Sequence, residues 1–395
     1  MSIARVAVAA AASVVMAAPG VAGAQTPQLS IEGPAVRAPG VEIAVVVRGA
    51  PPGAPVHLEH RTPRSWVVVA TGVAAGDGTV RLRYRPHRPR ARHPLRAAAP
   101  GALPSRTLDV RTRAVTLAAF GDANFGDGVA TVMARRGDLW PWRDVAPVLR
   151  RADVAFGNLE CAISRRGAPV AKEFRFRGRP GALRRVVRFA GLDVLNLANN
   201  HVGDYGTAAL LDTVRHVRRS GALPVGAGAT LAAARRPAVT TRLGLRIAFV
   251  GFSDIGPGSF AAGLRRPGTA FATLPVIRAG VREAARRADV VVATFHWGVE
   301  RARQENARQR AFARAAISSG ATAVIGAHPH VLQPIRRPAR RRLIAYSLGN
   351  FVWAAGSALT SSTGILHLRL STRGVESARL QRGRILGTRP RVRLR

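Results

Sequence analysis

Short apolar runs recur along the chain from residue 114 onwards, and most of them lead directly into polar residues. The runs are rich in β-branched residues, which is typical of buried strands, and segments with helical periodicity lie between several of them. Alternating strands and helices predict a layered α/β domain. The predicted strands cover residues 114–120, 154–157, 194–198, 245–252, 290–295, 323–325, 342–347 and 365–370, and the predicted helices cover 140–151, 205–220 and 304–319.

The polar residues that follow these runs form a set of candidate metal ligands. Residues that follow the strands of an open α/β sheet are delivered to one edge of that sheet, where active sites gather. Carboxylate, amide oxygen and imidazole make a mixed O/N set that suits Zn²⁺, Mn²⁺ or Fe. The set consists of Asp122, Glu160, Asn200, His296, His328 and His330.

Histidines are concentrated at the predicted strand ends. The chain has ten histidines, and four of them follow apolar runs: His201, His296, His328 and His330. Imidazole is the commonest protein metal ligand, and a pair two residues apart can serve one metal or two adjacent ones. The alternative is that His328 and His330 are ordinary turn residues, and the other candidate ligands at strand ends favour the metal interpretation.

The residues before this region predict a leader and a small β domain. Residues 1–24 have a positive start, a short apolar stretch and the small-residue site Ala22-Gly23-Ala24, so we expect a cleaved signal peptide and a mature protein outside the cytoplasmic membrane. Residues 25–112 contain short strand-like runs separated by Pro and Gly clusters, which predict a small immunoglobulin-like β-sandwich. The Arg-rich segment 81–96 is interpreted as a solvated edge and loop rather than a polymer-binding face.

The formal net charge of +40 favours anionic partners. Nearly all the cationic charge is arginine, since Lys172 is the only lysine. Aromatic residues make up 5% of the chain and no nucleic-acid-binding motif is present, so nucleic acid is a poor candidate. Anionic cell-surface polymers or a membrane face fit the charge at least as well. The only cysteine, Cys161, excludes an internal disulfide and is interpreted as a small buried residue rather than a nucleophile.

Residues from about 115 to 370 resemble the CapA family of capsule-synthesis or poly-γ-glutamate-synthesis proteins. That family's fold looks like the fold of calcineurin-type metallophosphoesterases. The resemblance therefore implies, for residues 113–395, a β-sandwich flanked by helices with metals at one end. Six motifs carry it, in order: Gly121-Asp122, Asn158 to Glu160, Ala198 to Gly206, His296 to Glu300, Gly326 to Val331 and Ser347 to Phe351.

The resemblance also implies a role for each candidate ligand. Asp122 and His330 would hold the first of two divalent ions, and Glu160 would bridge both ions. The second ion would be held by one amide oxygen and two imidazoles, those of Asn200, His296 and His328. In the phosphoesterases the position two after the first aspartate is usually histidine, but here it is Asn124. Glutamate also replaces the bridging aspartate.

A further histidine resembles an acid catalyst. His201 follows Asn200, as the acid histidine follows asparagine in the phosphoesterases, and could protonate a leaving group while Asp204 holds its ring. The alternative is that His201 caps the helix predicted to begin near Tyr205.

Three functions remain open from the sequence. The first is a metal-dependent hydrolase or transferase in the assembly of an anionic surface polymer, either polyglutamate or a teichoic-type polymer. The second is a non-catalytic scaffold for polymer binding or export that keeps the fold, working with membrane-bound synthetase subunits. The third is a basic polymer-binding protein in which the β domain makes the contacts.

Overall fold

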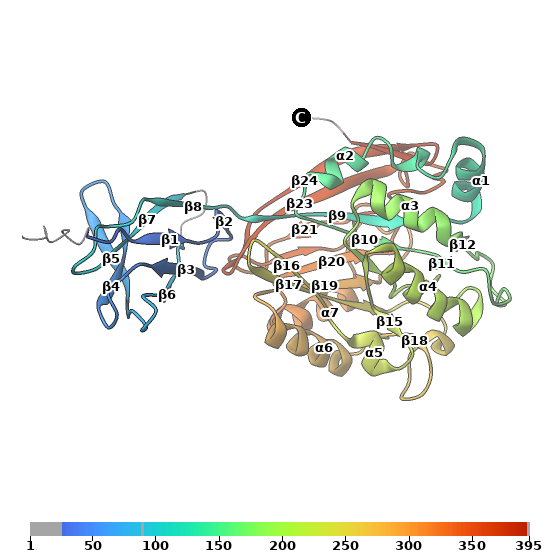
Figure 1. The fold of residues 1–395 in the computed structure, drawn as a ribbon. Coiled ribbons are helices and arrows are strands. Elements are labelled where there is room, and N and C mark those ends of the chain that lie inside the picture. Colours follow the sequence, from blue (N-terminus) through green and yellow to red (C-terminus); the bar gives the residue numbers. More distant parts are fainter. Residues whose placement is uncertain (1–25, 88–90, 393–395) are drawn as a thin grey trace, which may run out of the picture.

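The structure is a computed structural model that describes residues 26–87 and 91–392, so the leader predicted for residues 1–24 lies outside the described residues. Two strand-rich parts follow one another along the chain. Figure 1 shows the first, made of residues 30–112, at one end of the molecule. Among the described residues, no helix is both long enough and apolar enough to cross a membrane.

The first part contains two small sheets that share a core. One sheet has the order β1 (Ser30–Glu32), β3 (Ile43–Arg48), β6 (Val80–Tyr84). The other has the order β2 (Val36–Arg37), β8 (Leu108–Thr112), β7 (Arg92–Ala98), β4 (Pro55–Arg61), β5 (Trp66–Val73). Alternate residues face inward because successive side chains of a strand point to opposite faces, as Ile43, Val45 and Val47 of β3 show.

Strand β7 corrects one prediction. The sequence predicts a solvated edge and loop for residues 81–96, but β7 pairs with β4 and β8 inside the five-stranded sheet. His93, Leu95 and Ala97 are buried in it, and this alternation is the signal that was missed. Pro94 cannot donate a ladder hydrogen bond. It lies directly before Leu95, the first residue of β7 that pairs with β4, so no hydrogen bond to β4 is lost there.

The second part is built on two larger sheets. The first has seven strands in the order β14 (Leu223–Val225), β13 (Val194–Asn196), β10 (Val154–Leu159), β9 (Val115–Ala123), β23 (Ser362–Ser371), β24 (Gly374–Leu386), β25 (Arg389–Val392). The second has six strands in the order β16 (Ala238–Arg242), β17 (Leu245–Ser253), β19 (Val290–His296), β20 (Ala323–Ala327), β22 (Leu343–Ala345), β21 (Ile335–Arg336). Strands β9, β10, β13 and β14 run parallel, as do β17, β19, β20 and β22.

Apolar side chains of both sheets fill the space between them. On β9, Leu117 belongs to this shared core, whereas Phe120 points to the outer face. The rings of Phe156 on β10 and Phe249 on β17 stack across the interface with their centroids 5.4 Å apart. Burial of this apolar surface holds the two sheets together, and so fixes how their strand ends meet.

Helices cover the outer faces of the two sheets (Figure 1). The seven-stranded sheet is covered by α1 (Asp127–Arg136), α2 (Ala146–Arg150), α3 (Pro180–Ala190) and α4 (Gly206–Ser220). The six-stranded sheet is covered by α6 (Leu274–Arg287) and α7 (Ala307–Ser318). The order of layers is helix, sheet, sheet, helix, and the prediction of an α/β chain is confirmed.

The remaining described elements are α5 (Leu231–Arg235), the paired strands β11 (Ala162–Ile163) and β12 (Arg177–Gly178), the paired strands β15 (Ala227–Gly228) and β18 (Gly268–Thr269), and the 3₁₀ turns η1 (Trp140–Trp142) and η2 (Gly258–Phe260).

The helix ends follow local chemistry. The helix predicted at residues 140–151 is divided into η1 and α2, each of which has a proline in its first turn, where its missing N–H costs nothing. Helix α7 begins at a capping box in which Asn306 and Gln309 each accept a backbone N–H of the other.

Candidate metal centre

The candidate ligands lie at the carboxyl ends of parallel strands in both large sheets. Asp122 is near the end of β9 and Glu160 directly follows β10, whereas His296 ends β19 and His328 follows β20. The side chains of Asp122, Glu160 and His296 are fully buried. Because the two sheets lie face to face, residues from both meet at one end of the shared core.

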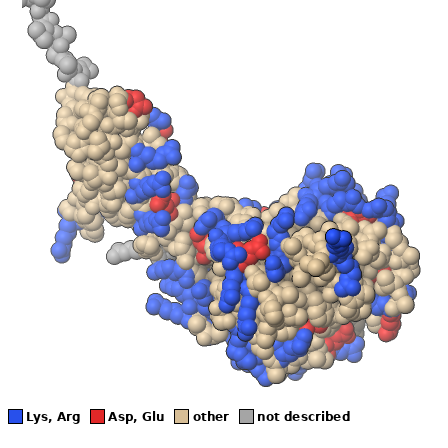
Figure 2. Space-filling model, turned by 90° about the horizontal axis from the view of Figure 1, so that it is seen from below, with Lys and Arg blue, Asp and Glu red and all other residues tan. Residues whose placement is uncertain are grey.

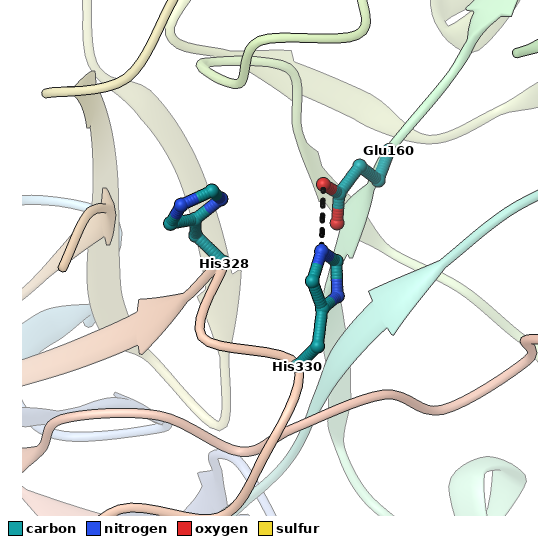
Figure 3. A group of neighbouring side chains, drawn as sticks. All are labelled: Glu160, His328 and His330. Atoms are coloured by element: carbon teal, nitrogen blue, oxygen red, sulfur yellow. Dashed lines mark ion pairs between the residues drawn. The ribbon is translucent and has the colours of Figure 1, made fainter. Parts of the chain in front are cut away.

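Two overlapping groups of side chains bring their ligand atoms together. The atoms of Glu160, His328 and His330 lie within 4.8 Å of one another, and so do those of Asp122, Glu160 and His296. Figure 3 shows the Glu160 carboxylate directed at His330, with Oε1 3.9 Å from Nε2. The same oxygen lies 3.4 Å from His296 Nε2. Glu160 belongs to both groups, which is the place that a carboxylate bridging two cations would occupy.

Two buried atoms of this cluster have no hydrogen-bond partner among the described residues. They are Oε1 of Glu160 and Nδ1 of His328. Leaving a buried polar atom unpaired costs about 1–3 kcal/mol, and a bound cation would remove that cost. Oxygen and imidazole donors without thiolate suit Zn²⁺, Mn²⁺ or Fe. The residues present therefore fit a divalent metal ion.

Burial and mutual repulsion shift the pKa values of three members of the cluster. Burial, followed by the charge of Asp122, raises the pKa of Glu160 well above its ordinary value. Burial, followed by the neighbouring His328, holds the pKa of His296 well below its ordinary value. Burial lowers the pKa of His328 to about 3. Both imidazoles are therefore neutral at pH 7, which is the form that binds a metal.

An amide network behind the cluster orients its carboxylates. Asn158 Nδ2 donates to Asp122 Oδ1 at 2.8 Å and to Glu160 Oε2 at 3.4 Å. Asn196 and Asn199 each donate to Asn158 Oδ1, at 2.9 and 3.3 Å. The sequence patterns predict no role for Asn158 or Asn196. The signal for them was a polar residue inside or at the end of an otherwise apolar strand.

Two side-chain amides contact the histidines of the cluster. Asn200 Oδ1 lies 2.7 Å from His296 Nε2, so the structure brings this predicted residue to the cluster. Asn350 Oδ1 lies 2.8 Å from His330 Nδ1. His328 and His330 have positive φ angles of 96° and 59°, which L residues rarely adopt. This strained turn follows β20 directly and places both rings in the cluster.

His201 and Asp204 form a second buried group beside the ligands. His201 Nδ1 lies 2.7 Å from Asp204 Oδ2, and its Nε2 lies 3.9 Å from Glu160 Oε1. Burial lowers the pKa of His201, although the hydrogen bond to Asp204 opposes the shift. The N-cap of α4 is Tyr205, four residues after His201, and the His201 ring contacts Asp204 and Lys172. The alternative that His201 caps this helix is therefore wrong.

Lys172 is a residue of the site that the sequence analysis missed. Its Nζ lies 2.6 Å from the Asn200 carbonyl oxygen, 2.9 Å from Asp204 Oδ1 and 3.1 Å from His201 Nδ1. The available signal was compositional, because this is the only lysine among 61 basic residues.

Two other residues named from the sequence lie apart from the ligand groups. Asn124 Oδ1 accepts the backbone N–H of Gly126 at 2.7 Å, so its side chain serves a local turn. Cys161 is fully buried and burial raises the pKa of its thiol, which agrees with the prediction of a small buried residue.

The fold and the buried cluster define an α/β protein with a candidate site for divalent metal. The chain belongs to the bacterial capsule synthesis protein family PGA_cap, whose profile matches residues 116–355. This confirms the CapA-type resemblance. All eight predicted site residues lie inside that range, and the strands of residues 30–112 precede it.

Named relatives are similar over the same region. The "PGA biosynthesis protein CapA" of Bacillus subtilis (strain 168) is 33% identical over 257 residues, which are 64% of this chain and 67% of the relative. The "Capsule biosynthesis protein CapA" of Bacillus anthracis is 30% identical over 268 residues, which are 66% of this chain and 65% of the relative. A "probable polyglutamine synthesis accessory protein" of Mycobacterium tuberculosis is 33% identical over 227 residues, which are 54% of this chain and 59% of the relative.

Proposed function

We propose that this chain acts outside the cytoplasmic membrane in the biosynthesis of an anionic surface polymer, through a metal-dependent hydrolase or transferase site. The observation that carries the proposal is the buried cluster in which Glu160 is shared by two groups of ligand atoms. The family and the relatives named for capsule and polyglutamate synthesis support the role in polymer biosynthesis.

The fold supports the same proposal at a finer level. Two facing sheets with outer helices and a polar cluster at one end are consistent with a calcineurin-type metallophosphoesterase domain in residues 113–395. The two small sheets before it, with a core of their own, are consistent with an immunoglobulin-like sandwich domain in residues 25–112.

The roles of the residues follow from their positions. One or two divalent ions would be held by Asp122, Glu160, Asn200, His296, His328 and His330. Such ions lower the pKa of a water molecule and neutralise negative charge that develops on the substrate.

The proton is moved by a residue outside that set. Since the pKa of His201 is held below its ordinary value by burial, its ring is neutral at pH 7, with Nδ1 protonated and donating to Asp204 Oδ2. Nε2 therefore takes the proton that the attacking nucleophile releases and delivers it to the leaving group.

The experiment that tests this proposal measures metal and turnover together. Protein purified without chelators is assayed by elemental analysis and against an aryl phosphate and a γ-glutamyl amide, before and after metal removal. Turnover that disappears with the metal and returns on adding it back supports an enzyme. A metal-loaded chain that turns over neither substrate favours the alternative, a non-catalytic scaffold for polymer binding or export.

The charge of the chain supports an anionic polymer as its partner. Membrane-bound synthetase subunits are proposed as further partners from the relatives named for polymer synthesis. The 21 acidic residues can pair with only part of the 61 basic ones. Figure 2 shows basic side chains spread over one face with few acidic ones between them. A hollow of about 670 Å³ on β24 and β25 is lined by arginines that include Arg384 and Arg391, which lie opposite each other in register. A polyanion would offset the repulsion between them.

We expect the chain to bind polyglutamate or teichoic acid, and to lose that binding in salt. Raising the ionic strength from about 0.1 M to about 1 M shortens the screening length from ~10 Å to ~3 Å. Binding of a polyanion through many arginines should then weaken by on the order of 10²-fold or more. Titrations by fluorescence anisotropy, with neutral dextran as the control polymer, measure this. Affinity that is the same at both salt concentrations would argue against an electrostatic contact.

The location is proposed from the sequence of the leader. Cleavage after Ala22-Gly23-Ala24 should leave a mature chain that begins at Gln25 in the cell-envelope or secreted fraction. Mass spectrometry of the amino-terminal peptide measures this directly. Recovery of an intact chain from residue 1 in the cytoplasmic fraction would reject the proposed location.

A further inference from the structure

Lys172 lies between the His201–Asp204 pair and the candidate metal ligand Asn200. It lies in the segment that connects β11 to β12, and its side chain is 23% exposed. This segment is tied to Asp204 on both sides of the lysine. Val170 N–H donates to the Asp204 carbonyl oxygen at 3.0 Å, and Phe176 N–H donates to Asp204 Oδ2 at 2.7 Å. The ammonium is therefore held where it is by the backbone around it.

The contacts of Lys172 suit an ammonium and not a guanidinium. Three atoms of Asn200, His201 and Asp204 lie within 3.1 Å of the single atom Nζ. An ammonium can donate from one atom to both oxygens of this set, the Asn200 carbonyl and Asp204 Oδ1, whereas arginine spreads five donors across a rigid plane. The other 60 basic residues of the chain are arginines, and only this position has lysine.

We propose that Lys172 is a positioning residue that requires an ammonium group. It fixes the peptide between Asn200 and His201 by binding the Asn200 carbonyl oxygen. The Asn200 side chain is thereby directed into the ligand cluster, and Nε2 of His201 is turned toward the same cluster. Lys172 also compensates the fully buried charge of Asp204. This inference rests on the proposed metal site, since it concerns the placement of Asn200 as a ligand.

The contact with His201 is steric rather than a hydrogen bond. Nδ1 of His201 lies 2.7 Å from Asp204 Oδ2, and an ionised carboxylate can only accept, so Nδ1 carries the proton of this bond and cannot also accept one from the ammonium. The ammonium therefore blocks rotation of the ring and keeps Nε2 turned toward the cluster. Removing it would leave the Asp204 charge paired only with the His201 and Phe176 N–H groups.

The test compares three variants with the wild type: Lys172→Met, Lys172→Arg and Lys172→Cys. Loss of a residue that orients a metal ligand by hydrogen bonding typically weakens metal affinity ~10- to 100-fold. We expect that loss for Zn²⁺ or Mn²⁺ in all three variants, measured by competition with a chromogenic chelator. Arg165→Met is the matched control, because it removes one positive charge from the same segment at an exposed position without touching the site.

Chemical rescue separates positioning from general structure. Treating Lys172→Cys with 2-bromoethylamine forms a thioether, releases bromide and restores an ammonium at nearly the original length. The native thiol of Cys161 is fully buried, so the reagent should leave the wild type unchanged. We expect aminoethylation to return the metal affinity to near the wild-type value, whereas Lys172→Arg, with the same charge, stays weak.

The outcomes distinguish this inference from the proposed function. If the wild type binds metal and Lys172→Arg binds it equally well, the requirement for an ammonium is wrong and the proposed metal site stands. If the aminoethylated variant is folded, as judged by circular dichroism, but still binds metal weakly, the positioning role is wrong. If the wild type itself binds no divalent metal, the proposed function and this inference both fall.

Discussion

Replacing Glu160 by glutamine should remove the metal from this protein while leaving its fold intact. Glu160 is the side chain that both groups of ligand atoms share. Glutamine has the same shape but no negative charge, so the variant loses the anion that two cations would need. The loss of affinity should exceed the ~10- to 100-fold that follows removal of an outer-shell partner. Elemental analysis after dialysis measures it, and the exposed Glu173→Gln is the matched control.

The same variant should show a gain in stability when no metal is present. Burial and the nearby charge of Asp122 raise the pKa of Glu160, so its ionised form costs free energy in the folded state. Removing that charge should therefore raise the melting temperature of the chelated protein, and added metal should stabilise only the wild type. Glu160→Gln protein that keeps its full metal content, or a chelated variant that melts below the chelated wild type, would contradict this account.

The sequence predicts that these polar residues come together because parallel strands bring their ends to one edge of a sheet. Asp122, Glu160, His296 and His328 each lie at the end of an apolar run, and the structure places all four in one buried cluster. Periodicity alone shows where a strand ends, and the topology of α/β sheets then fixes which ends meet. No such rule locates Lys172, because the segment that carries it folds back over Asp204 through contacts between residues distant in sequence.

The misses in the fold have equally specific causes. Strand β7 is hidden by arginine and proline, although His93, Leu95 and Ala97 alternate as a half-buried strand should. The helix expected at residues 140–151 is divided into two short pieces, each with a proline in its first turn. In both cases prolines, joined in β7 by arginines, made the sequence untypical of the element that forms.

A large effect on turnover without release of metal is expected from His201→Ala. His201 is not a member of either group of ligand atoms, and its Nε2 is 3.9 Å from Glu160 Oε1. The charge of Asp204 stays compensated in the variant, because Lys172 and the Phe176 N–H still bind it. Folding should therefore survive.

A group that transfers a proton in the transition state typically contributes ~10²–10⁴-fold, so turnover of an aryl phosphate or a γ-glutamyl amide should fall by that factor at constant metal content. His328→Ala should instead lose metal and activity together, because His328 lies in a ligand group. His216→Ala, on the α4 helix that follows the site, is the matched control and should change neither. Steady-state kinetics and elemental analysis on the same preparations separate these results. An active wild type whose rate is unchanged by His201→Ala would exclude a proton-transfer role, and the buried pair of His201 and Asp204 would then serve only to hold the turn that presents Asn200.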